Sequence, residues 1–138
     1  MTERGTYTLL VELTDPAVVE FGALGERDLP AGHYAYTGSA FGPGGFSRVE
    51  RHREVAAGER DVRHWHVDYL LGDPRSRVAE VVKSPGADVE CEVSRSIDAA
   101  PVAGVGCSDC QCGSHLQYAE NRDELVRKVR RAHEAARG

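Results

Sequence analysis

Two tyrosines stand beside glycines in segments whose composition is typical of β-strands. Residues 5–7 read Gly-Thr-Tyr and residues 36–38 read Tyr-Thr-Gly, so Tyr7 and Tyr36 each lie two positions from a glycine. A tyrosine can act as a base only where its neighbours lower its ordinary pKa of about 10. Together the two triplets indicate a site that cuts phosphodiester bonds.

Arg48 and Glu90 supply groups that complement the two tyrosines. Phosphoryl transfer concentrates negative charge, which a planar guanidinium and a hard, oxygen-ligated cation such as Mg²⁺ both neutralise. Arg48 falls in a predicted helix directly after the glycine-rich loop at residues 42–45. Glu90 falls in a later predicted helix, closer to its apolar stripe than Glu92 does.

In this order, on two strands and two helices, Tyr7, Tyr36, Arg48 and Glu90 resemble the GIY-YIG nuclease family. Both triplets have threonine in the middle instead of isoleucine, and an unusually long stretch separates them. That stretch is similar to a branch of the superfamily described as a domain of unknown function. Its recurring features resemble residues 36–40, 48–52 around Arg51, 64–70 (HWHVDYL), 90–91 and 108–116 (SDCQCGSHL).

The resemblance implies a role for each of the four residues. Tyr7 would activate the attacking water, Tyr36 would help to orient it, Arg48 would stabilise the phosphate charge, and Glu90 would bind Mg²⁺ or Mn²⁺. The implied activity is metal-dependent hydrolysis of nucleic acid, most simply DNA. A competing hypothesis is a non-catalytic module that binds nucleic acid or a protein partner.

Several neighbouring side chains are candidates to support this site. His64 and Asp68 are four positions apart and would share a face of a predicted helix, where they could bind a metal or a phosphate, whereas His66 points elsewhere. Structural support by local hydrogen bonds is an equally good interpretation. The supporting candidates are Gly38, Ser39, His52, His64, His66 and Asp68.

A cluster of soft ligands lies in the second half of the chain. Cys107, Cys110, Cys112 and His115 fall within nine residues, and this donor set suits Zn²⁺. Buried or reactive thiols are the alternative, because zinc sites usually gather two separated pairs of ligands. A third hypothesis for the whole protein is therefore thiol-based redox or metal-handling chemistry.

The net charge of the chain argues against a global attraction to nucleic acid. There are 17 Lys and Arg residues against 22 Asp and Glu, which gives a formal charge of -5. Any contact with nucleic acid must therefore be local. The candidates are Arg51, Arg127, Lys128, Arg130 and Arg131, although a solvated helix face is the default interpretation of the last four.

The predicted strands and helices indicate that residues 1–138 form a single small α+β domain. Its sheet is mainly antiparallel and is flanked by helices. Strands are predicted at 6–13, 18–21, 33–37 and 77–83, the first three as an antiparallel meander. Helices are predicted at 47–57, 62–71, 88–98 and 121–137, the last a basic amphipathic helix beyond a core of about 4–118. Ser47 with Glu50, and Asn121 with Glu124, have capping-box spacing. Neither a signal peptide nor a membrane span is evident, so we expect a cytoplasmic location.

Overall fold

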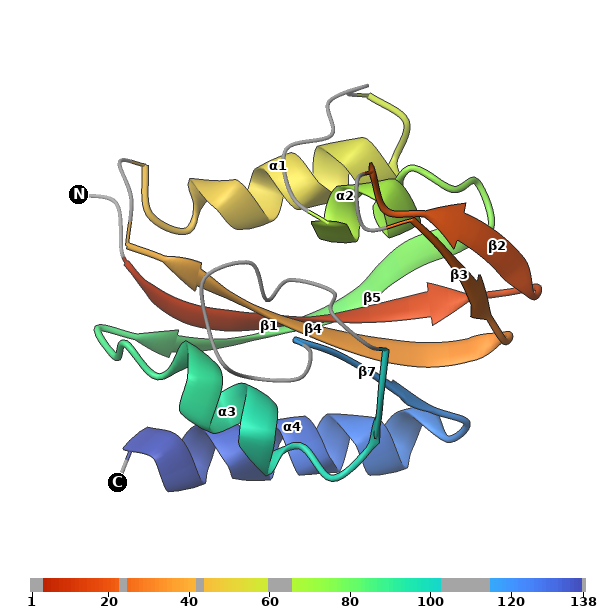
Figure 1. Cartoon of the computed structure of the whole chain (residues 1–138). Helices are drawn as coiled ribbons and strands as arrows, with labels where there is room; N and C mark the ends of the chain where they lie inside the picture. Colours follow the sequence, from red (N-terminus) through yellow and green to blue (C-terminus); the bar gives the residue numbers. More distant parts are fainter. Residues whose placement is uncertain (1–3, 23–24, 42–43, 60–65, 103–114, 138) are drawn as a thin grey trace.

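The central element of the fold is a five-stranded antiparallel sheet with helices on both faces (Figure 1). The computed structural model describes residues 4–22, 25–41, 44–59, 66–102 and 115–137. The strand order in the sheet is β5-β1-β4-β7-β6. The predicted α+β class, with a mainly antiparallel sheet flanked by helices, is confirmed.

Strands β1 (Gly5–Leu13) and β4 (Gly32–Ala40) form the centre of the sheet and pair along their full length. Strand β5 (Ser76–Pro85) pairs with the other edge of β1. The short strand β7 (Leu116–Ala119) pairs with only the first part of β4, and β6 (Ala100–Pro101) lies beyond it. Among the described residues, the second half of β4 therefore has a strand neighbour on one side only.

The predicted meander is wrong. Strand β2 (Ala17–Glu20) does not join the main sheet but pairs with β3 (Glu26–Leu29) in a separate two-stranded sheet. The long strands β1 and β4 bury almost every residue, so pairing them directly buries more apolar area than pairing β1 with the short β2. Strand β3 escaped prediction because Glu-Arg-Asp-Leu has little intrinsic strand preference, and only its pairing with β2 makes it extended.

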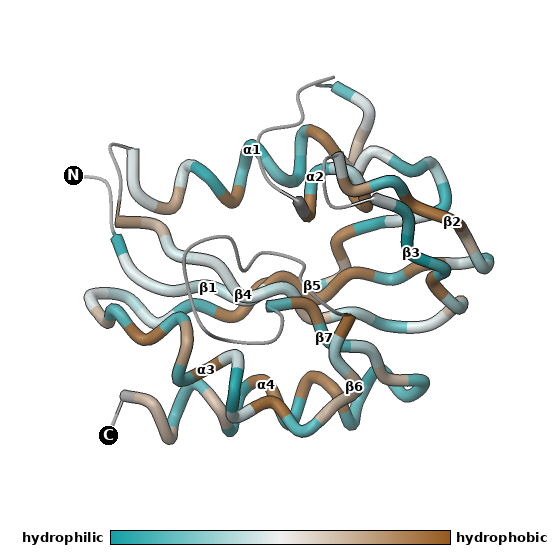
Figure 2. The backbone as a smooth tube through the Cα atoms, in the orientation of Figure 1, coloured by the Kyte–Doolittle hydropathy of each residue, from teal (hydrophilic) through white to brown (hydrophobic). Residues whose placement is uncertain are grey.

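The helices form two layers, one on each face of the sheet (Figure 1). Helices α1 (Ser47–Ala56) and α2 (His66–Leu71) cover one face, and α3 (Glu90–Ser96) and α4 (Arg122–Arg137) cover the other. Hydrophobic and hydrophilic residues alternate along α1 and α4, as expected for helices with one buried side (Figure 2). No helix in the described part of the chain has both the length and the apolar character that crossing a membrane requires.

Strand alternation divides the interior into two cores. On β1, Tyr7, Leu9 and Val11 belong to the core beneath α1 and α2, whereas Leu10 belongs to the core beneath α3 and α4. The second core also contains Leu125, Val129 and Ala132 of α4, so this helix is an integral part of the packed structure.

A buried polar cluster joins α4 to strands β1, β4 and β5. His133 on α4 lies between two hydroxyls, with Nε2 2.8 Å from Thr8 Oγ1 and Nδ1 2.7 Å from Ser84 Oγ. Thr8 Oγ1 lies in turn 2.9 Å from Thr37 Oγ1. All four side chains are buried, and their mutual hydrogen bonds offset the cost of removing them from water.

Of the two sites with capping-box spacing, only one has a side-chain cap in the structure. Asn121 Oδ1 accepts a hydrogen bond of 2.9 Å from the Glu124 backbone N–H at the start of α4, which confirms Asn121 as a cap. Ser47, in contrast, is the first residue inside α1, and Phe46 occupies the cap position without a side-chain hydrogen bond. The backbone turns at residues 44–46 supply the early hydrogen bonds of α1 in its place.

Candidate active site

The antiparallel register of β1 and β4 brings the two tyrosine triplets together. Tyr7 stands opposite Gly38, and Tyr36 lies two residues earlier on β4, hence on the same face of the sheet. A Cβ atom at Gly38 would lie 2.6 Å from Tyr7 Oη and 3.2 Å from Tyr36 Cε2. A side chain at position 38 would therefore collide with the Tyr7 ring, which explains the glycine there. At Gly5, a side chain would collide with the Ser84 carbonyl oxygen on β5.

Tyr7 is the first of three buried polar groups that form a hydrogen-bonded chain and come from three elements. Tyr7 Oη is 2.8 Å from Nε2 of His52 on α1, and His52 Nδ1 is 3.0 Å from Oδ1 of Asp68 on α2. Tyr7 is 1% exposed, His52 0% and Asp68 2%. The His52 ring also contacts both tyrosine rings, with centroid distances of 5.7 Å to Tyr7 and 6.2 Å to Tyr36.

These contacts indicate where the protons of His52 and Tyr7 lie. The Asp68 carboxylate accepts the Nδ1–H of His52, which leaves Nε2 as an acceptor for the Tyr7 hydroxyl. Burial raises the pKa of Tyr7 well above its usual value, the neighbouring Tyr36 raises it further, and Arg48 lowers it. The lowered pKa that a lone tyrosine base needs is therefore absent, and Tyr7 has a histidine as a proton acceptor instead.

Arg48 and Glu90 come from opposite layers and meet at the backbone of Ser39. Arg48 Nη1 donates a hydrogen bond to the Ser39 carbonyl oxygen, and the Ser39 backbone is close enough to Glu90 to lower the pKa of its carboxyl. Ser39 lies in the half of β4 that β7 does not reach, since β7 pairs only with residues 33–36. The arginine and the carboxylate can approach each other there, around the edge of β4 that has no described strand partner.

The middle threonine of the first triplet positions Glu90. Thr6 Oγ1 donates to the Ala87 carbonyl oxygen at 2.8 Å and accepts from the Val89 N–H at 3.1 Å. Val89 directly precedes α3, whose first residue is Glu90. The threonine that stands in place of isoleucine in the first triplet therefore holds the loop that carries the candidate metal ligand.

Glu90 lies in a mixed electrostatic environment. Burial raises the pKa of its carboxyl, Asp88 raises it further, and Arg48 and the Ser39 backbone lower it. Two more ligand-type side chains are close by: His115 Nδ1 lies 3.7 Å from Glu90 Oε2, and Cys91 Sγ lies 3.9 Å from His115 Nε2. Burial lowers the pKa of His115, which favours the neutral imidazole.

The sequence places these groups within a family of related chains. The chain matches the family described as Domain of unknown function DUF123 over residues 6–138. The chain belongs to this family. No curated protein and no solved structure matches the chain. The DUF123 match extends from β1 to α4, so it includes the residues of both helical layers that meet at Ser39.

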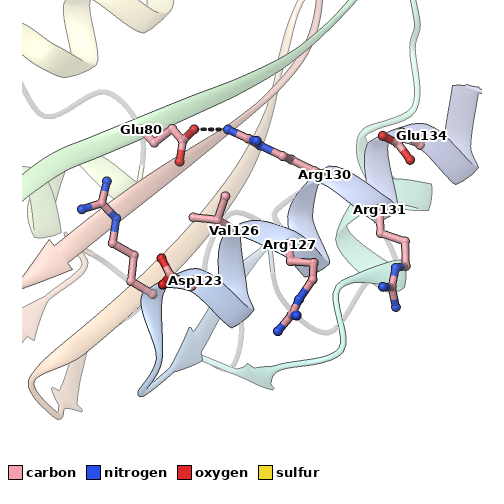
Figure 3. A pocket seen from close by; sticks show the side chains of 8 residues that line it. Glu80, Asp123, Val126, Arg127, Arg130, Arg131 and Glu134 are labelled. Carbon is pink, nitrogen blue, oxygen red and sulfur yellow. Dashed lines mark hydrogen bonds and ion pairs between the residues drawn. The ribbon is translucent and has the colours of Figure 1, made fainter.

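Within this DUF123 domain, the predicted nucleic-acid contacts on α4 lie on the opposite side of the sheet from Arg48. Three of them, Arg127, Arg130 and Arg131, line a depression of ≈ 470 Å³ between α4 and β5 (Figure 3). Acidic side chains interrupt the basic ones: Arg130 forms an ion pair with Glu80, and Lys128 Nζ lies 3.1 Å from Glu124 Oε1. The lining residues are Glu80, Arg122, Asp123, Val126, Arg127, Arg130, Arg131 and Glu134.

Some predicted site residues of the DUF123 domain lie outside the described part of the chain. His64, Cys107, Cys110 and Cys112 belong to this group, and so does the side chain of His66. Arg51 is half-buried on α1, one turn from Arg48.

Sequence reasoning missed two relationships at this site. It did not pair His52 with Asp68, because the two residues are 16 positions apart and no sequence pattern connects them. It also did not assign Cys91 to a site, although the adjacent Glu90 and Cys91 formed one of the recurring features.

Proposed function

We propose that this protein is a metal-dependent endonuclease, similar to GIY-YIG nucleases, that hydrolyses phosphodiester bonds in DNA. One observation carries the proposal. Arg48 is close enough to Tyr7 and to Glu90 to influence the pKa of each, while His52 and Asp68 stand behind the tyrosine. A base, a cation and a carboxylate that converge in this way are the groups that phosphoryl transfer needs.

The Tyr7–His52–Asp68 chain supports a proton path that avoids a buried phenolate. As Tyr7 Oη accepts a proton from the attacking water, its own proton passes to His52 Nε2 over 2.8 Å. Asp68 then stabilises the imidazolium through the 3.0 Å contact with Nδ1. The raised pKa of Tyr7 is compatible with this path, because the phenol never carries a full negative charge.

Arg48 is suited to bind the scissile phosphate. Its guanidinium presents five N–H donors, and one of them is engaged by the Ser39 carbonyl oxygen, which orients the plane of the group. A guanidinium oriented in this way stabilises charge that develops on phosphate oxygens. Ser39 itself is half-buried, so the phosphate would approach at the unpaired half of β4.

Glu90 fits the role of a ligand to Mg²⁺ or Mn²⁺. Its side chain is 29% exposed, which leaves room for the several water ligands that Mg²⁺ keeps when a single carboxylate holds it. A bound cation would neutralise negative charge on the phosphate oxygens. Ser39 orients the carboxylate, and Thr6 holds the loop from which Glu90 extends.

A second candidate function is a binding module without catalytic activity. The near-complete burial of Tyr7 and His52 favours it, since a fully satisfied hydrogen-bonded chain also serves as a rigid core element. In that case Arg48 and Glu90 would contact a partner, and loss of the Tyr7 hydroxyl would lower stability without removing any reaction.

The test is cleavage of labelled single-stranded, duplex and branched DNA, with RNA for comparison, in Mg²⁺ or Mn²⁺. Tyr7→Phe, Arg48→Ala and Glu90→Gln should each lower the rate by about 10²-fold or more. Matched controls are Tyr34→Phe, which removes a buried phenol hydrogen bond elsewhere on the sheet, together with Arg53→Ala and Glu92→Gln on the same helices. Cleavage that survives all three site variants, or no cleavage with any substrate, would favour the binding module.

A further inference from the structure

In the described part of the chain, Glu90, Cys91 and His115 form a compact group of metal-ligand types. The group shares Glu90 with the proposed reaction, so the same carboxylate would serve either the Mg²⁺ of that reaction or an ion held by all three residues. If each residue offers one ligand atom, the three atoms lie within 4.8 Å of one another. Glu90 Oε2 lies 3.7 Å from His115 Nδ1, and Cys91 Sγ lies 3.9 Å from the other ring nitrogen, Nε2. A single ion would use one of these two nitrogens, so only one of the two contacts is a separation between ligands of that ion.

With one nitrogen of His115 as a ligand, the three ligand atoms lie within 4.8 Å of one another, which is wider than the separations in a tetrahedral zinc site. Zinc–ligand bonds of about 2.0–2.3 Å place neighbouring ligand atoms about 3.5 Å apart in a tetrahedron. Cys91 and Glu90 are half-buried, so rotation of their side chains can close the remaining distance. His115 is 1% exposed and forms the fixed wall of the site.

The backbone that carries the three ligands is held in place by other contacts. The His115 carbonyl oxygen accepts a 3.0 Å hydrogen bond from Thr37 N on β4, which anchors the residue preceding β7. Gln117 Nε2 on β7 donates to Ser94 Oγ on α3 at 3.2 Å. The two elements that supply the ligands are therefore joined to each other independently of any metal, so binding requires little rearrangement.

We propose that Glu90, Cys91 and His115 bind Zn²⁺ or a similar borderline divalent cation. A thiolate, an imidazole and a carboxylate together suit zinc far better than Mg²⁺, which prefers oxygen ligands. The thiolate and the carboxylate neutralise the two charges of the ion. Three protein ligands leave a fourth position for water or another ligand.

This site differs from the zinc loop predicted from sequence. That prediction drew four ligands from one short segment, whereas Cys91 lies on α3 and is separated from His115 by 24 positions. Ligands from separated elements meet the usual pattern of zinc sites. The proposal does not depend on nuclease activity, because metal binding is its readout.

The experiment is protection of the Cys91 thiol from alkylation by Zn²⁺ in the full-length chain, followed by peptide mass spectrometry. The zinc dissociation constant is first measured by competition with Co²⁺. At a free Zn²⁺ concentration ten times that constant, alkylation of Cys91 should slow about tenfold. Because the peptide that contains Cys91 is read separately, the other three cysteines do not contribute to the signal.

Variants identify the partners of the thiol. Glu90→Gln and His115→Gln should each weaken protection of Cys91 by about tenfold in zinc concentration or more, whereas Glu92→Gln, an exposed neighbour on α3, should leave it unchanged. If His115→Gln does not fold, Glu90→Gln together with the Co²⁺ absorption of Cys91→Ser still decides the question. Equal alkylation with and without Zn²⁺, or a thiolate–cobalt band that Cys91→Ser retains in full, would overturn the proposal.

Discussion

His52 Nε2 lies 2.8 Å from Tyr7 Oη, although 45 positions separate the two residues along the chain. The contact joins α1 to the first strand at the point where the two tyrosine triplets meet. It gives the buried phenol a proton acceptor, and Asp68 orients that acceptor from a third element. The tyrosine, the histidine and the aspartate therefore act as a unit.

The first prediction concerns His52. If the proposed function is right, His52→Gln should lower the DNA cleavage rate by about 10²–10⁴-fold, because the phenol then lacks a proton acceptor. Single-turnover cleavage with saturating DNA measures this effect separately from binding. An equal loss of rate in Arg53→Ala, a surface change on the same helix, would show that α1 responds to any substitution.

A second prediction concerns the fit between Gly38 and Tyr7. Gly38→Ala should lower the free energy of unfolding by about 1–3 kcal/mol, because the new methyl group would lie 2.6 Å from Tyr7 Oη. Denaturant unfolding of the single variants and of the double variant with Tyr7→Leu measures the coupling. The cost of Gly38→Ala should fall sharply once the ring is absent, and an unchanged cost would show that the strain arises elsewhere.

Thr6 provides a third prediction, about the placement of α3. Thr6→Val keeps the shape of the side chain but removes the hydroxyl that bonds Ala87 O and Val89 N. The free energy of unfolding should fall by about 1–3 kcal/mol, because these backbone groups lose their partner. Amide exchange at Val89 should also accelerate. Thr14→Val, at an exposed turn, is the control, and an equal effect there would refute the special role of Thr6.

A fourth prediction concerns pH and the turn before β5. Asp73 accepts hydrogen bonds from the backbone and the side chain of Arg75, and the side-chain bond to Arg75 is the main reason that the pKa of Asp73 is lowered. Because the pKa of Asp73 is lowered in the folded state, its ionised form stabilises the protein above the unfolded pKa of about 3.9. This stabilisation is lost as the pH falls through the pKa of the folded state.

The corresponding substitution is Asp73→Asn. It should cost less than about 1 kcal/mol at neutral pH, because the largely exposed Arg75 leaves the pair screened by water. Thermal unfolding from pH 7 into the acid range measures the difference between variant and wild type. That difference should shrink toward low pH, and a constant gap at every pH would assign the effect to the turn geometry alone.

Much of the secondary structure could be predicted because its signals are local. The apolar stripe of α4 and its Asn121 cap, or the runs of β-branched residues in β1 and β5, depend only on residues close in sequence. Strands β3 and β7 could not be predicted in this way, since each is short and is extended only because it pairs with another strand, the neighbouring β2 for β3 and the distant β4 for β7. The cap at Ser47 failed because the glycine-rich turns already satisfy the start of the helix.

The sequence by itself determined which chemical groups this protein has and on which kinds of element they stand. Residue type, spacing and family resemblance predicted Tyr7, Tyr36, Arg48 and Glu90 as the site residues, and that assignment stays a prediction. Only the tertiary structure decided which groups touch: Tyr7 with His52, Arg48 and Glu90 through the Ser39 backbone, and Cys91 with His115. The physical reason is that these contacts depend on strand register and on the packing of two helical layers, which long-range burial decides and no local pattern records.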